Sequence, residues 1–422
     1  MYAPLKIGSI IMRYLALITC VLLSVSVNAA KTMDLNFGQS YAMESNYLEG
    51  GKRNYYINLP SGYSGSKKEY PVLYVLDGQM HFPSAVAIQH SLGASTDVPE
   101  MIIVGIENAY PDRKDLVWQK KDAYISFLSK ELIPLIDNKY RTKKERIVFG
   151  WEMGSYFSSY LLLHKSQLFD GAISSNGGFV DKKLIKKFES LEVKKDRYLY
   201  LVNSIQDIYS IDYTNSAVEA LNEHPNQHLV WESELLNNET HSSLPYLAMF
   251  NGLRYFYHNY NSYEFYSIKQ YEDLGGIPAL KKYFKARAKR FGFPEGIDNS
   301  TKDTLIWLAW KRDNFKYFDF FMSEFKDVLK TQRYQSEYWQ NRLGQYYLKY
   351  NRYDKAIEFF NRGRNEFEET ARVYHGLGQA YLGKDNKKLA IEYFKIAVDI
   401  ATKNSDDNLG NYQSDLDNAE KG

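Results

Sequence analysis

The chain has 422 residues, of which 53 are Lys or Arg and 51 are Asp or Glu, so its formal net charge is only +2. This balance excludes the large basic excess with which nucleic-acid-binding proteins neutralise phosphates. The composition, 44% apolar and 25% charged, is that of an ordinary globular protein rather than a disordered or membrane-embedded one. The length allows two or three domains.

The first 29 residues are typical of a secretory signal peptide. An apolar run from Leu15 to Val27 ends in Val27-Asn28-Ala29, which has small residues at the spacing that a signal peptidase recognises. This run is shorter than the roughly 20 residues that cross a bilayer as a helix. We therefore expect an exported chain, periplasmic or extracellular, with no integral membrane span after cleavage. The true start, Met1 or Met12, stays open.

Cysteine and histidine usage argues against a metal site or a thiol-based site. Cys20, the only cysteine, lies inside the apolar run, so the cleaved chain would have no disulfide, thiolate nucleophile or cysteine ligand. The histidines show no metal-binding spacing, and the chain has neither a Gly-x-Gly-x-x-Gly turn nor a Walker-type phosphate loop. The sequence predicts no metal and no cofactor.

From about residue 54 to 233, short β-rich runs alternate with helix-like segments. Runs such as Val72–Leu76 and Ile102–Val104 are apolar on both faces, as strands covered by helices must be. Ala123–Lys139 and Tyr156–His164 have apolar residues at helical spacing. The alternation predicts an α/β sandwich with a mostly parallel sheet. The expected strands are Asn54–Leu59, Val72–Asp77, Met101–Glu107, Arg146–Gly150, Gly171–Ser174, Tyr198–Asn203 and His228–Trp231.

Beyond about residue 265 the pattern becomes helical and repeats itself. At an offset of 34 residues the matching pairs are Leu343/Leu377, Gly344/Gly378, Tyr347/Tyr381, Ala356/Ala390, Phe360/Phe394 and Gly363/Ala397. These are tetratricopeptide positions, where small residues let paired helices approach and aromatic rings fill the space between them. A degenerate unit containing Leu308-Ala309, Phe321 and Phe325 would precede them. Stacked repeats of this kind commonly hold a peptide or a partner protein.

A strand, a sharp turn and a helix follow one another at Arg146–Tyr156. In hydrolases this turn carries Gly-x-Ser-x-Gly, because small residues around a strained nucleophile let it project at the carboxyl edge of the sheet. Here the glycines are Gly150 and Gly154, and the residue at the nucleophile position is Glu152.

Seven further segments match motifs of one known family. These segments are Tyr70–Gly78, Ile102–Asn108, Lys130–Ile136, Tyr140–Thr142, Leu168–Asp170, Thr240–Ser243 and Asn251–Arg254. With them the chain resembles the esterase family of α/β hydrolases that includes esterase D and the ferric-siderophore esterases. It is most similar to secreted members with C-terminal tetratricopeptide repeats, and the similarity covers nearly the whole mature chain. Members usually read Gly-His-Ser-x-Gly-Gly at the elbow, so this chain replaces the histidine, the serine and the last glycine with Trp151, Glu152 and Ser155.

The resemblance implies roles for the remaining site residues. The general base would be His241, and the supporting acid would be Asp207, which follows the expected Tyr198–Asn203 strand. The oxyanion hole would be formed at Gly78, Gln79 and Met153. The resemblance also implies an α/β-hydrolase sandwich followed by an all-α repeat domain. The expected parts are a signal peptide at 1–29, an esterase-like domain at 31–265, a helical linker at 266–299, tetratricopeptide-like repeats at 300–405 and a disordered tail at 406–422.

Glu152 allows three interpretations. A carboxylate that attacks an acyl carbon gives an anhydride, which is more reactive than the ester, so the ordinary esterase route should be lost. The site is then either dead, with Glu152 paired to a protonated His241, or attacks saturated carbon, as the aspartate of dehalogenases does. In the third interpretation Glu152 or His241 acts as a general base on water, or another serine serves. The nearby serines are Ser155, Ser158, Ser159, Ser174 and Ser175.

The sequence therefore predicts an exported esterase-family protein that lacks normal serine-esterase activity and binds an ester-like ligand or a protein partner. The alternative is an active carboxylic ester hydrolase with a non-standard site that uses His241 and the oxyanion hole. Nucleic acid is not an expected partner.

Overall fold

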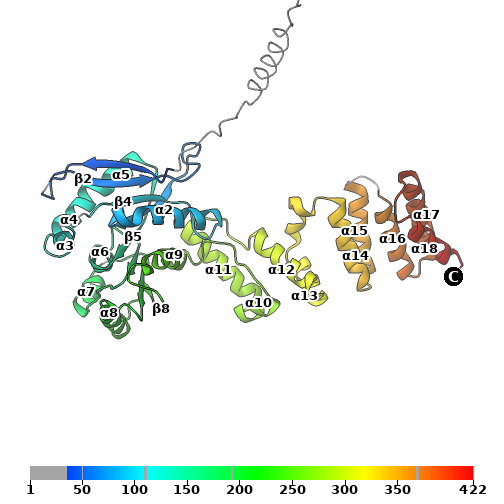
Figure 1. The fold of residues 1–422 in the computed structure, drawn as a ribbon. Coiled ribbons are helices and arrows are strands. Elements are labelled where there is room, and N and C mark those ends of the chain that lie inside the picture. Colours follow the sequence, from blue (N-terminus) through cyan, green and yellow to red (C-terminus); the bar gives the residue numbers. More distant parts are fainter. Residues whose placement is uncertain (1–35, 50, 109–111, 192, 367–369, 422) are drawn as a thin grey trace, which may run out of the picture. The chain divides into compact units, whose positions relative to one another are not determined.

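The computed structural model describes residues 36–49, 51–108, 112–191, 193–366 and 370–421. The expected signal peptide, with Cys20, lies outside these ranges. The chain forms two compact units (Figure 1). Unit 1 runs to Ser91 and continues over Glu100–Gly252, and unit 2 contains Leu92–Pro99 and the chain from Leu253 onward. Among the described residues, no helix is long and apolar enough to cross a membrane.

Unit 1 contains one eight-stranded sheet in the order β1-β2-β4-β3-β5-β6-β7-β8. The strands are β1 (Gln39–Met43), β2 (Arg53–Asn58), β3 (Tyr70–Leu76), β4 (Ile102–Ile106), β5 (Thr142–Trp151), β6 (Gly171–Ser175), β7 (Arg197–Ser204) and β8 (Leu229–Leu236). β2 is antiparallel to both β1 and β4, and the other neighbours are parallel. The predicted mostly parallel sheet is confirmed, and all seven expected strands are present. β1 was not predicted because it is a short edge strand whose residues are partly or fully exposed.

Helices follow most strands of unit 1. They are α2 (Gly78–Ala94), α3 (Asp112–Val117), α4 (Lys121–Phe127), the π-helix η1 (Leu128–Leu132), α5 (Ile133–Lys139), α6 (Met153–His164), α7 (Lys182–Glu189), α8 (Ile211–Glu223) and α9 (Leu244–Phe256). The predicted helix at Ala123–Lys139 thus contains a π-turn. This turn precedes Pro134, which has no N–H to donate to the carbonyl four residues earlier.

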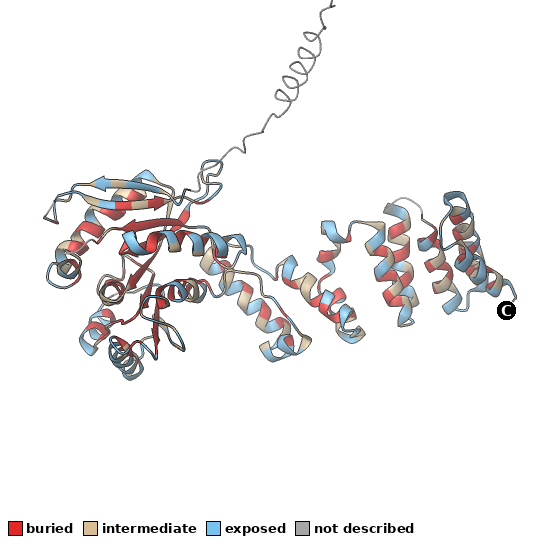
Figure 2. Ribbon diagram, viewed as in Figure 1, coloured by how far each residue is buried: buried red, intermediate tan, exposed pale blue. Residues whose placement is uncertain are grey.

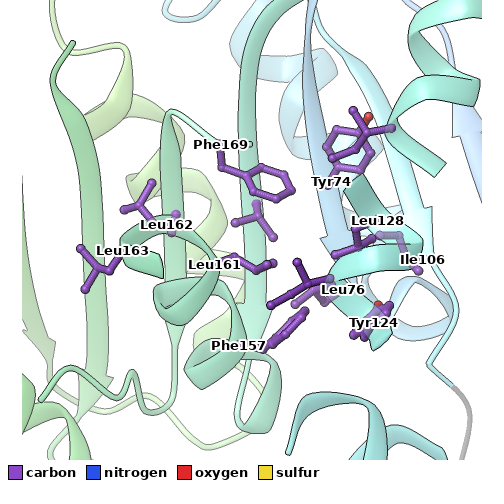
Figure 3. Packing of buried hydrophobic residues seen from close by; sticks show 14 of the residues in the cluster. Tyr74, Leu76, Ile106, Tyr124, Leu128, Phe157, Leu161, Leu162, Leu163 and Phe169 are labelled. Carbon is purple, nitrogen blue, oxygen red and sulfur yellow. The ribbon is translucent and has the colours of Figure 1, made fainter. Parts of the chain in front are cut away.

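Both faces of the sheet are covered, which explains why the central strands are apolar throughout (Figure 2). On one face, Leu76 of β3 packs with Tyr124 of α4 and with Phe157 and Leu161 of α6 (Figure 3). On the other face, helices α2 and α9 each pack closely against the sheet. A Cβ on Gly105 would lie 2.9 Å from the Phe82 ring of α2, and a Cβ on Gly252 of α9 would lie 2.8 Å from Ile173. Large side chains at these glycines would push the helices off the sheet.

Unit 2 is helical. Its elements are α10 (Ile268–Leu274), α11 (Gly276–Phe291), α12 (Asn299–Lys311), α13 (Phe315–Glu324), the 3-10 helices η2 (Lys326–Lys330) and η3 (Gln332–Tyr334), α14 (Glu337–Lys349), α15 (Tyr353–Glu366), α16 (Ala371–Gly383), α17 (Lys387–Asn404) and α18 (Leu409–Lys421). The predicted repeat is visible as a repeated contact. A Cβ on Gly344 would lie 2.5 Å from the ring of Phe360, and a Cβ on Gly378 would lie 2.5 Å from the ring of Phe394. Leu308, Ala309, Phe321 and Phe325 of the predicted degenerate unit are buried in the same core.

The predicted disordered tail at 406–422 is wrong, because most of it forms α18. Tyr412, Leu416 and Ala419 lie on one face of this helix and are buried against α16 and α17. Asp415 also pairs with His375 of α16, with 2.7 Å between the carboxylate and the ring nitrogen. The many Asn, Asp and Ser residues suggested disorder, but they occupy the exposed face of an amphipathic helix.

The expected boundaries of the first domain and the linker also differ from the structure. Apart from Leu92–Pro99, unit 2 consists of the chain from Leu253 onward, whereas the expected first domain ran to residue 265. The segment predicted as a linker forms α10 and α11, which bury Tyr271, Leu280 and Phe284 in the core that also contains Phe321. A linker contributes few buried side chains to a domain core. Because α10 and α11 contribute several, they belong to unit 2.

Candidate active site

Polar residues follow the carboxyl ends of five neighbouring parallel strands in unit 1. Asp77, Glu152 and Asn176 directly follow β3, β5 and β6, and each has a left-handed φ, of 53°, 54° and 57°. Asp207 follows β7, and His241 follows β8. The carboxyl ends of parallel strands share one edge of the sheet, which is where ligands bind in open α/β folds.

The turn from β5 into α6 has the geometry of a nucleophile elbow. Glu152 adopts φ 54° and ψ −115°, a conformation that costs roughly 1–3 kcal/mol for a residue with a side chain. A Cβ on Gly150 would lie 2.0 Å from the carbonyl oxygen of Gly154, so only glycine lets the helix start directly over the strand end. The N–H of Glu152 donates to the Ser175 carbonyl at 3.0 Å, which anchors the turn to β6. The elbow is therefore kept, with a carboxylate at its tip.

The ion-pair partner of Glu152 is Arg113 of α3, whereas one of the three interpretations paired Glu152 with a protonated His241. Nη1 of Arg113 lies 2.8 Å from Oε2 of Glu152. The same guanidinium donates from Nε and Nη2 to the two carboxylate oxygens of Asp77, at 2.8 and 2.9 Å, and from Nη2 to the Trp151 carbonyl at 3.2 Å. A bidentate guanidinium–carboxylate pair of this kind is among the stronger charge-assisted contacts. Arg113 thus joins the strand ends of β3 and β5.

The two carboxylates around Arg113 differ in burial. The side chain of Asp77 is 1% exposed and that of Glu152 is 40% exposed. Burial raises the pKa of Asp77, although the hydrogen bonds and charge of Arg113 oppose that rise. Burial alone would lower the pKa of Arg113, but the contacts with Asp77 and then Glu152 outweigh it, so this pKa is raised. Arg113 therefore stays charged and holds Glu152 in an ion pair.

His241 and Asp207 form a hydrogen-bonded pair, with 3.0 Å between Nδ1 and Oδ2. The same Asp207 oxygen accepts from Nδ2 of Asn176 at 2.8 Å and from Oγ of Ser210 at 2.7 Å. Burial would raise the pKa of Asp207, but these donors outweigh it and lower the pKa. An ionised Asp207 keeps the proton on Nδ1 of His241, which leaves Nε2 as the acceptor. This is the orientation that a histidine general base requires.

Trp151 lies where the resemblance places a histidine, and it supports His241. Its ring centroid is 5.1 Å from that of His241, and its Nε1 donates to the His241 carbonyl at 3.1 Å. The Trp151 ring also contacts His81, whose centroid lies at 5.3 Å. Burial, and secondarily the charge of Arg113, lower the pKa of His81 to about 4, so His81 is neutral.

The expected oxyanion-hole positions lie at two helix starts beside the elbow. Gly78 and Gln79 begin α2, and Met153 begins α6. The first N–H groups of a helix have no acceptor within it, so these amides can donate to a ligand. The Gln79 side chain is bonded in both directions to the Asn108 backbone, at 3.0 and 3.2 Å, which fixes the turn. The structure thus offers backbone donors at the predicted positions.

The alternative serines do not provide a nucleophile beside His241. Ser158 and Ser159 each lie 2.9 Å from the hydroxyl of Ser174, Ser155 donates to the Glu152 carbonyl, and Ser175 donates to Asn176. All five are fully buried. Within the described ranges, none of these hydroxyls bonds to the His241 ring, so they act in packing. Nor do the described residues include a group of three or more His, Cys, Asp and Glu side chains that could hold a metal ion.

Sequence reasoning missed Arg113 and Asn176. Asn176 precedes Gly177 and Gly178 directly after an expected strand, and this turn pattern could have placed it at the same edge as Glu152. Arg113 follows no recognisable motif, and only the fold brings it beside Asp77.

Comparison with known proteins gives matches to parts of the chain. A tetratricopeptide-repeat model matches residues 371–404. A curated but uncharacterised protein, YbbA of Bacillus subtilis, is 25% identical over 146 residues, and the match covers 31% of this chain and 58% of the relative. The chain therefore spans less than two thirds of that relative.

Solved structures are similar to this chain at low identity. An uncharacterised protein from Capnocytophaga ochracea has a TM-score of 0.54 and 14% identity, covering 89% of this chain and 99% of its own. An IroE-like serine hydrolase from Shewanella oneidensis has a TM-score of 0.48 and 20% identity, covering 68% and 98%. The enterobactin esterase FES from Shigella flexneri has a TM-score of 0.44 and 18% identity, covering 54% and 60%.

A family model described as "Putative esterase" matches residues 45–261. This range contains the elbow, Arg113 and the His241–Asp207 pair. Because it covers just over half of the 422 residues, the chain belongs to this esterase family.

Proposed function

We propose that unit 1 binds an ester-like ligand without normal serine-esterase turnover, and that the helical repeats bind a partner protein. The observation that carries the proposal is the ion pair between Glu152 and Arg113. The residue at the nucleophile position is a carboxylate and is held by a cation, while the elbow and the backbone donors around it are kept. A site of this kind can receive a carbonyl group but has no hydroxyl to acylate.

The magnitude of the expected loss is large. Removal of a triad nucleophile costs on the order of 10⁶ in turnover. Binding and a preorganised oxyanion hole alone can still leave catalysis of about 10³ over water. We therefore expect the wild-type chain to hydrolyse esters far more slowly than a member with serine at position 152.

The second candidate is a slow hydrolase in which His241 activates water. The supporting observation is the intact His241–Asp207 pair, whose carboxylate accepts from Asn176 and Ser210 as well. A positioned general base contributes typically about 10²–10⁴ in rate. In this candidate Glu152 repels a neighbouring anion or orients the water.

The test is turnover of p-nitrophenyl acetate by the purified full chain. The three proteins compared are wild type, Glu152→Ser and the double variant Trp151→His/Glu152→Ser. Each of the three is also measured with the additional change His241→Ala. The double variant restores the Gly-His-Ser order of the family. His228→Ala is the matched control for unspecific imidazole catalysis, because His228 lies outside the site with 37% of its side chain exposed.

An inert wild type, together with a Glu152→Ser variant whose activity depends on His241, would support the binding proposal. A wild type that turns over substrate, and loses this activity with His241→Ala but not with His228→Ala, would refute it in favour of the hydrolase. Serine variants that stay inert while folded would refute the assignment of position 152 as the nucleophile position.

We also propose that the chain is exported, with residues 1–29 removed as a signal peptide. The support is the apolar run and the small residues that end at Ala29. The test is the N-terminal mass of the protein recovered from the periplasm or medium of an expressing bacterium. A chain that keeps its first residues and stays in the cytoplasm would contradict this.

A further inference from the structure

Aromatic and basic side chains gather in unit 2 around two adjoining hollows of about 880 and 800 Å³. The two hollows share Trp307, Lys311 and Arg333. Many of their lining residues belong to α12 and α14. We call this region the α12–α14 groove. It lies outside the tetratricopeptide match at 371–404, and all of its lining residues belong to unit 2.

Arg342 is the best-positioned cation of the α12–α14 groove. Its guanidinium carbon lies 4.6 Å from the ring centroid of Trp310 and 5.2 Å from that of Trp339, and its Nη1 donates to the Tyr338 hydroxyl at 2.8 Å. It forms no ion pair with any residue that the structure describes. A guanidinium held against aromatic rings keeps its plane fixed and can donate two parallel hydrogen bonds to a carboxylate. Arg342 is therefore preorganised for a planar anion that the described chain does not supply.

Lys311 and Trp307, which line both hollows, repeat this arrangement. The ammonium of Lys311 lies 5.6 Å from the Trp307 centroid and, within the described ranges, has no carboxylate partner. Trp307 is 44% exposed, which is unusual for so large an apolar ring. Two other groove cations are already paired, Lys349 with Asp313 and Arg333 with Asp303. Both Lys311 and Arg342 thus combine an unpaired charge with an exposed aromatic surface.

The summed charge of the groove is positive. Its basic residues are Lys311, Arg312, Arg333, Arg342 and Lys349, and its acidic residues are Glu264, Asp303 and Asp313. A partner with negative charges would be attracted over distances of about 8–10 Å at ordinary ionic strength. The three acidic side chains and the near-neutral chain count against a phosphate backbone, which needs many unopposed cations.

We propose that the α12–α14 groove binds an acidic segment of a partner protein that also carries an aromatic side chain. Carboxylates of the segment bind Arg342 and Lys311, and its aromatic ring packs on Trp307. This names the kind of partner for the protein-binding role proposed above and does not depend on the chemistry at Glu152. Failure of the ester assay and failure of the peptide assay are therefore separate results.

The test is fluorescence anisotropy of a labelled dodecapeptide of Glu and Phe titrated with the full chain at low and physiological salt. A second peptide has Gln in place of Glu, and a third probe is a labelled oligothymidylate. The variants are Arg342→Ala and Lys311→Ala. The matched control is Lys403→Ala, which removes an exposed lysine of α17 outside the groove.

We expect saturable, salt-sensitive binding of the acidic peptide. Arg342→Ala should weaken it about tenfold or more, as truncation of an interface arginine anchor often does, and Lys311→Ala about threefold. Lys403→Ala should leave it unchanged. The proposal is overturned by no saturable binding, by equal binding of the Gln peptide, by tighter binding of oligothymidylate, or by an Arg342→Ala variant that binds as well as wild type. Because Lys311 is exposed, its variant tests the groove even if Arg342→Ala fails to fold.

Discussion

Replacing Arg113 with leucine is expected to destabilise unit 1 by about 3–5 kcal/mol at neutral pH, the usual cost of removing one partner of a buried ion pair. The reason is Asp77, whose side chain is 1% exposed and accepts two hydrogen bonds from Arg113. Glu152 adds no more than about 1 kcal/mol, because 40% of its side chain is exposed to solvent. Glu152→Gln should therefore cost far less than Arg113→Leu.

The loss should be smaller at acidic pH. Burial already raises the pKa of Asp77 in the folded protein. A carboxyl group with a raised folded pKa binds protons more tightly in the folded state, so its contribution to stability is greatest at low pH and is lost as pH rises through the folded pKa. Without Arg113 this pKa should rise further. The difference between Arg113→Leu and wild type should then shrink as the pH falls from neutral through the raised pKa of Asp77 in the variant.

The assay is hydrogen exchange measured by mass spectrometry in increasing urea, with the free energy of unfolding taken from peptides of β5 and α6. A local readout is needed because a chain with two units does not unfold in one step. Lys114→Leu is the matched control, since Lys114 is the exposed neighbour of Arg113 on α3. The reasoning is refuted if Arg113→Leu costs no more than Lys114→Leu, or if its cost grows as the pH falls.

Three further variants test the fold and the site. Gly344→Ala should destabilise the repeats by about 1–3 kcal/mol in thermal unfolding, because its Cβ would lie 2.5 Å from Phe360. Gly150→Ala should disrupt the elbow and increase hydrogen exchange at the start of α6, since its Cβ would lie 2.0 Å from the Gly154 carbonyl. Asp207→Asn should flatten the acid limb of the stability profile below about pH 4. Hydrogen bonds lower the folded pKa of Asp207 despite burial, so its stabilising contribution is present at neutral pH and is lost as pH falls through that pKa.

Two of these variants, Gly344→Ala and Asp207→Asn, have a matched control in the chain. Gly410→Ala adds a Cβ with no atom within 4 Å and should not destabilise unit 2. Asp212→Asn changes a carboxylate in the first turn of α8 and should leave the acid limb intact. Equal effects of Gly344→Ala and Gly410→Ala, or a Gly150→Ala variant with unchanged exchange, would contradict the close contacts described above. If Asp207→Asn leaves the acid limb of the stability profile unchanged, the lowered pKa of Asp207 does not contribute to stability as argued.

Local pattern was a good guide wherever contacts are close in sequence or periodic. Continuous apolar runs predicted the central strands, because both faces of a covered parallel sheet must be buried. The 34-residue spacing predicted helical repeats in which small residues let paired helices approach and aromatic rings fill the space between them. In the structure Gly344 contacts Phe360 and Gly378 contacts Phe394, because each repeat uses the same helix contact. The strand, turn and helix around Gly150 placed Glu152 at the elbow. The same methods failed for α18, where polar composition hid a narrow buried stripe.

The sequence by itself determined the fold class, the repeat and the identity of the residue at the elbow, since these depend on periodicity and on short motifs. Only the tertiary structure decided what Glu152 binds. Arg113 comes from the segment after β4 and Glu152 from the end of β5, and the strand order of the sheet brings them to one edge. Asn176 reaches Asp207 in the same way, across neighbouring strand ends. The energy of such long-range ion pairs and hydrogen bonds depends on burial and distance, which no local pattern encodes.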